Sequence, residues 1–148
     1  MKKTSLVKKP KRKPITKLKK EAWDAFSKFI RLRDCLVTQG STEFGSCITC
    51  GRVYHFKELQ AGHFVDSRTK PVLFNEDIVY AQCYGCNIPK KGNKDAYTPK
   101  MVEMFGTAQT LEFLELRHNK DKTWTRQELE DILALYTRKY AELLEKND

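Results

Sequence analysis

No stretch of this chain is apolar for long enough to cross a membrane, since a transmembrane helix needs about 20 apolar residues. The basic N-terminal residues are also not followed by the apolar segment of a secretory signal. With no export signal, we expect the cysteines to stay reduced, which favours metal binding over disulfide bonds. At 148 residues the chain has the length of one compact domain with a tail.

Acidic side chains are missing from the first 20 residues, which hold ten Lys or Arg. The remainder carries 18 basic and 19 acidic side chains, so the net charge of +9 comes almost wholly from this segment. We expect residues 1–16 to form a disordered basic arm, because the segment repels itself and has little apolar surface to bury. A solubilising tail is one interpretation, and binding to a membrane surface is another, although no amphipathic apolar face accompanies the charge. Binding to a nucleic-acid backbone by counterion release is favoured, and no membrane partner is expected. The expected contacts are Lys8, Lys9, Lys11, Arg12 and Lys13.

Cysteine is scarce but clustered, and four of the five residues form two Cys-x-x-Cys pairs, Cys47/Cys50 and Cys83/Cys86. Two such pairs predict a tetrahedral zinc site, and Gly51 permits the tight turn under the first pair. Four thiolates leave no open coordination position, so the metal is expected to be structural. The alternative, a redox dithiol, usually lies at a helix start in a βαβ unit, which the sequence does not indicate.

Apolar periodicity predicts an α+β protein with helices on both sides of a small strand region. A helix is expected over residues 17–33, a loop over 38–46, and strands over 59–65 and 78–81. The expected units are the arm (1–16), a zinc-knuckle core with its N-terminal helix (17–97) and a helical region (98–148).

Three features predict the boundaries of the C-terminal helices. Thr98-Pro99 has the pattern of an N-cap with proline in the first helical position, and Gly106 that of a helix stop. Thr125 with Glu128 predicts a capping box before a long amphipathic helix.

Histidine is also rare, and the three residues differ in setting. His118 lies among charged residues, and His55 follows the first cysteine pair, where it could substitute as a ligand although four cysteines suffice. His63 lies between the two pairs, with Asn75 and Asn87 downstream. A lone strand histidine is more often structural than catalytic, but this context favours a chemical role.

Taken together, these motifs resemble an HNH endonuclease core in its His-Asn-Asn form, and more narrowly the lambdoid-phage NinG (Rap) recombination endonucleases. The resemblance covers about residues 20–100 and includes the helix that contains Trp23 and Arg33. It rests on Cys47-x2-Cys50, Ala61-Gly62-His63-Phe64, Phe74-Asn75-Glu76, Gln82-Cys83-x2-Cys86-Asn87 and Lys91-Gly92-Asn93.

The resemblance implies a ββα-metal fold in which His63 is the general base that activates water and Asn75 holds the loop that orients it. It implies that Asn87 binds a catalytic Mg²⁺ or Mn²⁺ ion. Many HNH enzymes carry an acidic residue just before the histidine, whereas this chain has Gly62, so the second protein ligand stays open among nearby side chains. Those side chains are Asp66, Glu76, Asp77 and Gln60, and the expected phosphate contacts are Arg68, Lys70, Lys90 and Lys91.

Two classes of function follow. The first is a metal-dependent endonuclease that cuts branched DNA, such as Holliday junctions and D-loops, in the bacterial host cytoplasm during phage recombination. Resolving a four-way junction takes two symmetric cuts, for which a homodimer would be natural. The second is a zinc-stabilised nucleic-acid-binding protein without catalytic activity. A binding module has no need of His63, Asn75 and Asn87 at these places, whereas a nuclease does.

Overall fold

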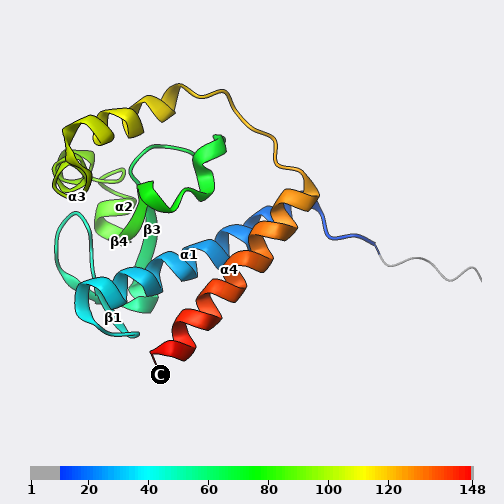
Figure 1. The fold of residues 1–148 in the computed structure, drawn as a ribbon, viewed down its shortest axis with the longest axis horizontal. Helices are drawn as coiled ribbons and strands as arrows, with labels where there is room; N and C mark the ends of the chain where they lie inside the picture. The colour runs from blue at the N-terminus through cyan, green and yellow to red at the C-terminus, as the bar shows by residue number, and fades with distance from the viewer. Residues whose placement is uncertain (1–10, 148) are drawn as a thin grey trace, which may run out of the picture.

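The computed structural model describes residues 11–147, and the basic residues Lys8 and Lys9 lie outside this range. Figure 1 shows two long helices, α1 and α4, side by side, with the strands packed against α1 and α3 beyond them. The α+β class is therefore confirmed. The helices are α1 (Ile15–Gln39), α2 (Tyr84–Asn87), α3 (Lys94–Glu115) and α4 (Arg126–Lys146), and the strands are β1 (Phe44–Ser46), β2 (Val53–His55), β3 (Leu59–His63) and β4 (Val79–Cys83).

Helix α1 confirms the helix predicted over residues 17–33 but is longer than predicted at both ends, and it carries an aromatic stripe of Trp23, Phe26 and Phe29. It begins at Ile15, so the last two residues assigned to the arm are helical, and it ends before Gly40, whose φ of 59° is easiest for glycine. Its stripe faces the core, where Phe26 and Ile30 are fully buried. The expected loop over 38–46 is wrong at both of its ends, because Thr38 and Gln39 finish α1 and β1 forms an antiparallel pair with β2.

Strands β3 and β4 form a second antiparallel hairpin, which carries His63 at the end of β3 and Cys83 at the end of β4. The register pairs Gln60 with Gln82 and Gly62 with Tyr80. Both predicted strands are confirmed with shifted ends. Helix α2 follows β4 directly, so the order of elements here is strand, strand, helix.

A buried ion pair on α1 fastens β4 to the helix. Arg33 donates to the Asp34 carboxylate at 2.8 Å and to the carbonyl oxygens of Glu76 and Val79 at 2.9 and 2.7 Å. Asp34 in turn accepts the Ala81 N–H at 2.7 Å. These bonds pair backbone groups on the edge of β4 that faces away from β3. The hairpin therefore needs no third strand to pair them.

The C-terminal helices correct one prediction and confirm two. Helix α3 begins at Lys94, so Thr98 lies inside it and bonds back to the Lys94 carbonyl instead of capping. The physical reason is the fully buried Tyr97, whose hydroxyl donates to the Gly62 carbonyl at 2.7 Å and draws the first turn onto the hairpin. Gly106 breaks the helix with φ 82°, as expected, and the capping box at Thr125 is present.

Helix α4 covers the face of α1 that points away from the hairpin. Tyr136 packs edge-on against Phe26 with ring centroids 4.8 Å apart, and Leu129 is fully buried beside Leu18 and Ala22. The end of the basic segment joins this contact, since Arg126 donates to the Lys13 carbonyl and Lys13 pairs with Glu21, both at 2.6 Å. Across residues 11–147, none of the helices combines the length and the apolar character of a membrane span.

Candidate metal centre and catalytic site

The four paired cysteines converge, as predicted. Cys47 and Cys50 lie in the turn between β1 and β2, Cys83 ends β4, and Cys86 lies in α2. Their sulfur atoms all lie within 4.8 Å of one another, with Cys50 and Cys83 3.9 Å apart. Sulfur atoms about 2.3 Å from a tetrahedral zinc would be about 3.8 Å apart, so the donor set fits zinc.

Hydrogen bonds around Cys47 favour its thiolate form, which is the form a metal requires. Burial alone would raise the pKa of Cys47, but hydrogen bonds from the Cys50 N–H, the Thr49 hydroxyl and the Cys83 N–H lower it to about 6. Gly51 has a φ of 74° and donates its N–H to the Cys47 carbonyl at 2.9 Å. The expected role of this glycine in the turn is thus confirmed. Cys35 is buried with Leu59 and Ala81, apart from the cluster, as a small apolar residue.

His63 is the last residue of β3, and its ring is fixed from two sides. The imidazole stacks on the indole of Trp23 with centroids 4.9 Å apart and an interplanar angle of 19°. Its Nε2 atom lies 3.1 Å from the carbonyl oxygen of Leu73. A carbonyl oxygen can only accept, so Nε2 carries the proton and Nδ1 carries the lone pair. The neutral ring is therefore oriented to accept a proton at Nδ1.

Burial lowers the pKa of His63 below its ordinary value, an effect opposed by the hydrogen bond to Leu73 and reinforced by the positive charge of Lys94. The Lys94 ammonium donates to the carbonyl oxygens of His63 and Phe64, both at 2.6 Å. It thereby fixes the backbone at the end of β3. His63 is consequently neutral at pH 7, which is the form a general base needs.

Asn75 makes its described hydrogen bonds within its own loop and not to His63. Its side-chain oxygen accepts the Asp77 N–H at 2.9 Å, and its N–H donates to the Val72 carbonyl. These bonds stabilise the two short 3₁₀ turns, Pro71–Phe74 and Glu76–Ile78, on either side of it. Since Leu73 belongs to the first turn, Asn75 holds the segment that presents the carbonyl to His63.

Asn87 ends α2 and faces the hairpin. Its amide nitrogen donates to the side-chain oxygen of Gln60 at 2.8 Å. Among the side chains left open as a second ion ligand, Gln60 is thus the one beside Asn87. Glu76 is held by Tyr136 and Lys139 at 3.0 and 2.7 Å.

The other two carboxylates of that set lie on exposed loops. The Asp66 side chain is 97 % exposed and pairs with Lys94 at 3.6 Å. Asp77 is exposed in the second 3₁₀ turn.

The side chain of Gln82 explains why position 62 is glycine. A Cβ atom built on Gly62 would collide with the Gln82 side-chain oxygen. Gln82 is fully buried, and its amide nitrogen donates to the Gly92 carbonyl at 2.9 Å and to the Thr49 hydroxyl at 3.1 Å. The carbonyl oxygen of Gly92 can only accept a hydrogen bond, so the amide nitrogen of Gln82 must point toward it. The side-chain oxygen of Gln82 must then point at Gly62. In residues 11–147 this oxygen has no hydrogen-bond partner.

The polar groups described beside Asn87 are amides of glutamine side chains. Gln60 and Asn87 offer neutral amide oxygens, and the orphaned Gln82 oxygen lies on the same face of the hairpin. Mg²⁺ accepts such hard ligands and keeps most of its waters, with substrate phosphate as a further ligand. Outside the four cysteines, the described residues form no group of three or more His, Cys, Asp or Glu side chains able to hold a metal.

The expected phosphate contacts divide into two sets. Lys70 donates to the Asn119 carbonyl at 2.8 Å and pairs with Asp121 at 2.9 Å, which leaves it little freedom for phosphate. Arg68, Lys90 and Lys91 are exposed, and the last two follow α2.

Sequence reasoning missed the site roles of Lys94, Gln82 and Asp34. Each of these side chains forms a hydrogen bond with a backbone group of a segment that is distant in the sequence. The available signals were weak ones: a glutamine within an apolar strand, and an Arg-Asp pair at the end of an aromatic helix stripe.

Comparison with known proteins gives one match. The model of the family described as bacteriophage lambda NinG protein matches residues 1–147. No curated protein and no solved structure matches the chain. Since the family model spans nearly every residue, including both cysteine pairs and His63, the chain belongs to the bacteriophage lambda NinG family.

Proposed function

We propose that this protein is a metal-dependent, structure-specific DNA endonuclease of the HNH type, acting on branched intermediates of phage recombination in the host cytoplasm. The observation that carries the proposal is the setting of His63. A neutral imidazole, with Nε2 bonded to the Leu73 carbonyl and one face stacked on Trp23, directs its free Nδ1 from the end of a hairpin that the cysteine cluster braces. An oriented neutral imidazole with one free nitrogen is what a general base requires.

In the proposed reaction His63 Nδ1 takes a proton from a water molecule, and the resulting hydroxide attacks the phosphorus of a phosphodiester. The bond from phosphorus to the leaving oxygen breaks as the new bond forms, and the leaving oxygen acquires a proton from solvent. Asn87 and Gln60 would hold the divalent ion, which when bound supplies positive charge beside the leaving oxygen. Trp23 and Lys94 keep the base in position throughout.

The proposed DNA contacts are the basic arm and the exposed cations near α2. The arm supplies sequence-independent attraction to phosphate, and Arg68, Lys90 and Lys91 are exposed cations that could add to it. A homodimer would allow the two symmetric cuts that resolve a four-way junction.

A zinc-stabilised DNA-binding protein without cleavage activity is the second candidate. Gly62 favours it, since the Gln82 amide fills the space where many HNH enzymes place a carboxylate. The zinc cluster and the cations would serve either function, so only a cleavage assay distinguishes the two.

The experiment is cleavage of a labelled four-way junction and a matched linear duplex, with Mg²⁺, Mn²⁺ or no divalent ion, by wild type and His63→Ala. We expect ion-dependent cuts near the branch point that vanish in the variant while zinc content and junction binding persist. Tight binding without cleavage in either ion would favour the binding protein. Cleavage by the variant would refute His63 as the base.

A further inference from the structure

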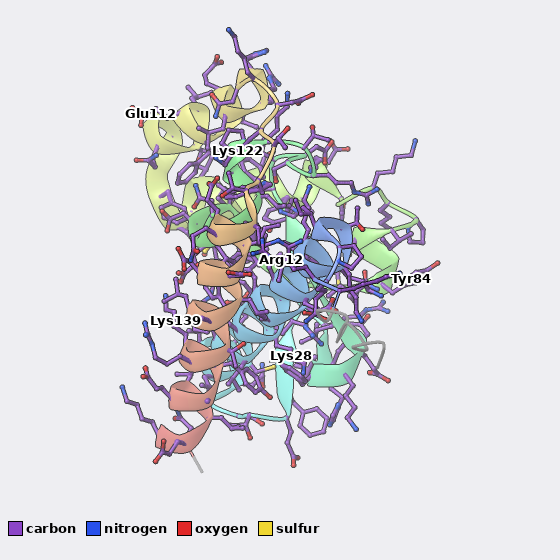
Figure 2. The ribbon with its side chains drawn as sticks, turned by 90° about the vertical axis from the view of Figure 1, so that its right-hand side faces the viewer. Arg12, Lys28, Tyr84, Glu112, Lys122 and Lys139 are labelled. Atoms are coloured by element: carbon purple, nitrogen blue, oxygen red, sulfur yellow. The ribbon has the colours of Figure 1, made fainter. Side chains whose placement is uncertain are left out.

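Tyr84 is an aromatic side chain that points into solvent beside the proposed active site. It is 59 % exposed, and Figure 2 shows its side chain projecting away from the body of the protein. Ile88, one turn later, is 53 % exposed, and its N–H donates to the Tyr84 carbonyl at 2.9 Å. An exposed aromatic next to an exposed aliphatic side chain costs solvation free energy unless a ligand covers them.

The backbone beneath Tyr84 is fixed. The residue lies between the zinc ligands Cys83 and Cys86, and the turn after α2 closes on the same segment. In that turn the Lys90 N–H donates to the Gly85 carbonyl at 3.3 Å and the Gly92 N–H to the Cys86 carbonyl at 3.0 Å. A ring on so rigid a support loses little conformational entropy when it binds.

The chain segment that contains Tyr84 carries charge of one sign. Residues 79–94 contain no Asp or Glu and three lysines. Lys90 and Lys91 are exposed, and Lys94 is bonded to the end of β3. A flat aromatic surface edged by cations matches a base next to its phosphates, since phosphate neutralises the cations while the base covers the ring.

We propose that Tyr84 stacks on an unstacked base at the branch point and so lets the protein distinguish branched DNA from linear duplex. This inference rests on the proposed function and names the feature of the substrate that is recognised. In a linear duplex each internal base is covered on both faces, and unstacking one costs a few kcal/mol. At a branch point base faces are already open, so stacking on Tyr84 is gained without that cost.

The position of Tyr84 also fixes where the cut falls. Tyr84 and Asn87 are the first and last residues of α2, a helix of four residues. A base stacked on Tyr84 would therefore lie about one helical turn, ~5 Å along the helix axis, from the Asn87–Gln60 pair. Cleavage near the branch point is the consequence.

The test measures binding without added divalent ion, so that it does not depend on cleavage. A junction with 2-aminopurine at the branch point reports stacking by fluorescence quenching, and a matched linear duplex is the reference. Tyr84→Leu should lose the quenching and weaken junction binding by roughly 5- to 100-fold, while duplex affinity stays within about twofold. Tyr84→Phe should keep both the quenching and the affinity.

Phe44→Leu is the matched control, because Phe44 is a second exposed aromatic, 45 % exposed on β1, and should not matter. Each variant is checked for wild-type zinc content, so that a folding defect is recognised. The proposal would be overturned if Tyr84→Leu lost equal affinity for junction and duplex, or if it kept the full fluorescence quenching. Absence of cleavage by wild type would instead refute the endonuclease and leave the stacking result to stand by itself.

Discussion

The buried carboxylate of Asp34 on α1 accepts the backbone N–H of Ala81 at the centre of β4, 2.7 Å away. Burial raises the pKa of Asp34, and the adjacent Arg33 opposes that effect. The contact joins the N-terminal helix to the strand that carries the second cysteine pair into place. The interaction is thus a structural tie between α1 and the strand that ends at the cysteine cluster.

Replacing Asp34 should destabilise the protein strongly. Asp34→Ala leaves the Arg33 charge and the Ala81 N–H without their partner, which should lower the free energy of unfolding by about 2–4 kcal/mol. Urea denaturation of the zinc-loaded protein measures the change. Asp24→Ala, at an exposed position of the same helix, is the control and should change stability by less than about 0.5 kcal/mol.

Cleavage should depend on pH through His63. The pKa of His63 is lowered by burial, so at any given pH a larger share of the base is neutral than in an ordinary histidine. We expect kcat/KM to be level near neutral pH and to fall tenfold per unit only as the pH drops through the lower pKa of the folded state. A single-turnover pH profile checks this. An acid limb centred above pH 6.5 would contradict the lowered pKa.

The stability of the folded protein should also depend on His63, and it should decrease toward low pH as the proposed activity does. A histidine whose folded pKa is depressed stabilises the fold fully above its unfolded pKa, and that contribution is lost as the pH falls through the folded value. Thermal unfolding between pH 7 and 5 should therefore show a decrease in stability that His63→Gln reduces.

Gly62 and Gln82 should be energetically coupled. Gly62→Ala pushes a methyl group into the Gln82 amide and should cost about 1–3 kcal/mol. Gln82→Ala removes the side chain that the new methyl group would meet. The double variant should therefore lose less unfolding free energy than the two single variants lose in total, by about 1 kcal/mol or more. A double-mutant cycle in urea measures the coupling, and strict additivity would show that the two side chains do not compete for space.

Zinc should be required for folding. Cys83→Ser removes one of four ligands, and we expect loss of bound zinc and of the cooperative unfolding transition, because metal-binding free energy contributes directly to folding here. Atomic absorption and near-UV circular dichroism report the two losses. Cys35→Ala is the control, since Cys35 lies outside the cluster, and it should retain one zinc per chain.

The basic arm should contribute electrostatic affinity alone. Deleting residues 1–10 removes four lysines and keeps the Lys13 contacts with Glu21 and Arg126. We expect weaker binding to junction and duplex alike, with the salt slope reduced by up to about 4. Titrations from 50 to 200 mM salt measure it. An unchanged slope would exclude the arm from the interface.

Local patterns predicted much of this molecule, and contacts between distant segments account for the rest. The cysteine pairs and the Thr125 capping box are set by neighbouring residues, so their spacing sufficed. The start of α3 was wrong because the long-range bond from Tyr97 to Gly62 outweighs the local signal of Thr98-Pro99. The competition between Gln82 and position 62 depends on strand register, which no local pattern reports.

The pairing of α1 with α4 sets the order in which the protein can mature on the ribosome. Helix α1 is synthesised more than 80 residues before α4, yet Phe26 and Ala22 are covered by Tyr136 and Leu129. Until α4 emerges, the nascent chain carries an uncovered aromatic stripe and relies on chaperones or on the hairpin alone. The proposed cleavage activity would then require chains translated past Tyr136.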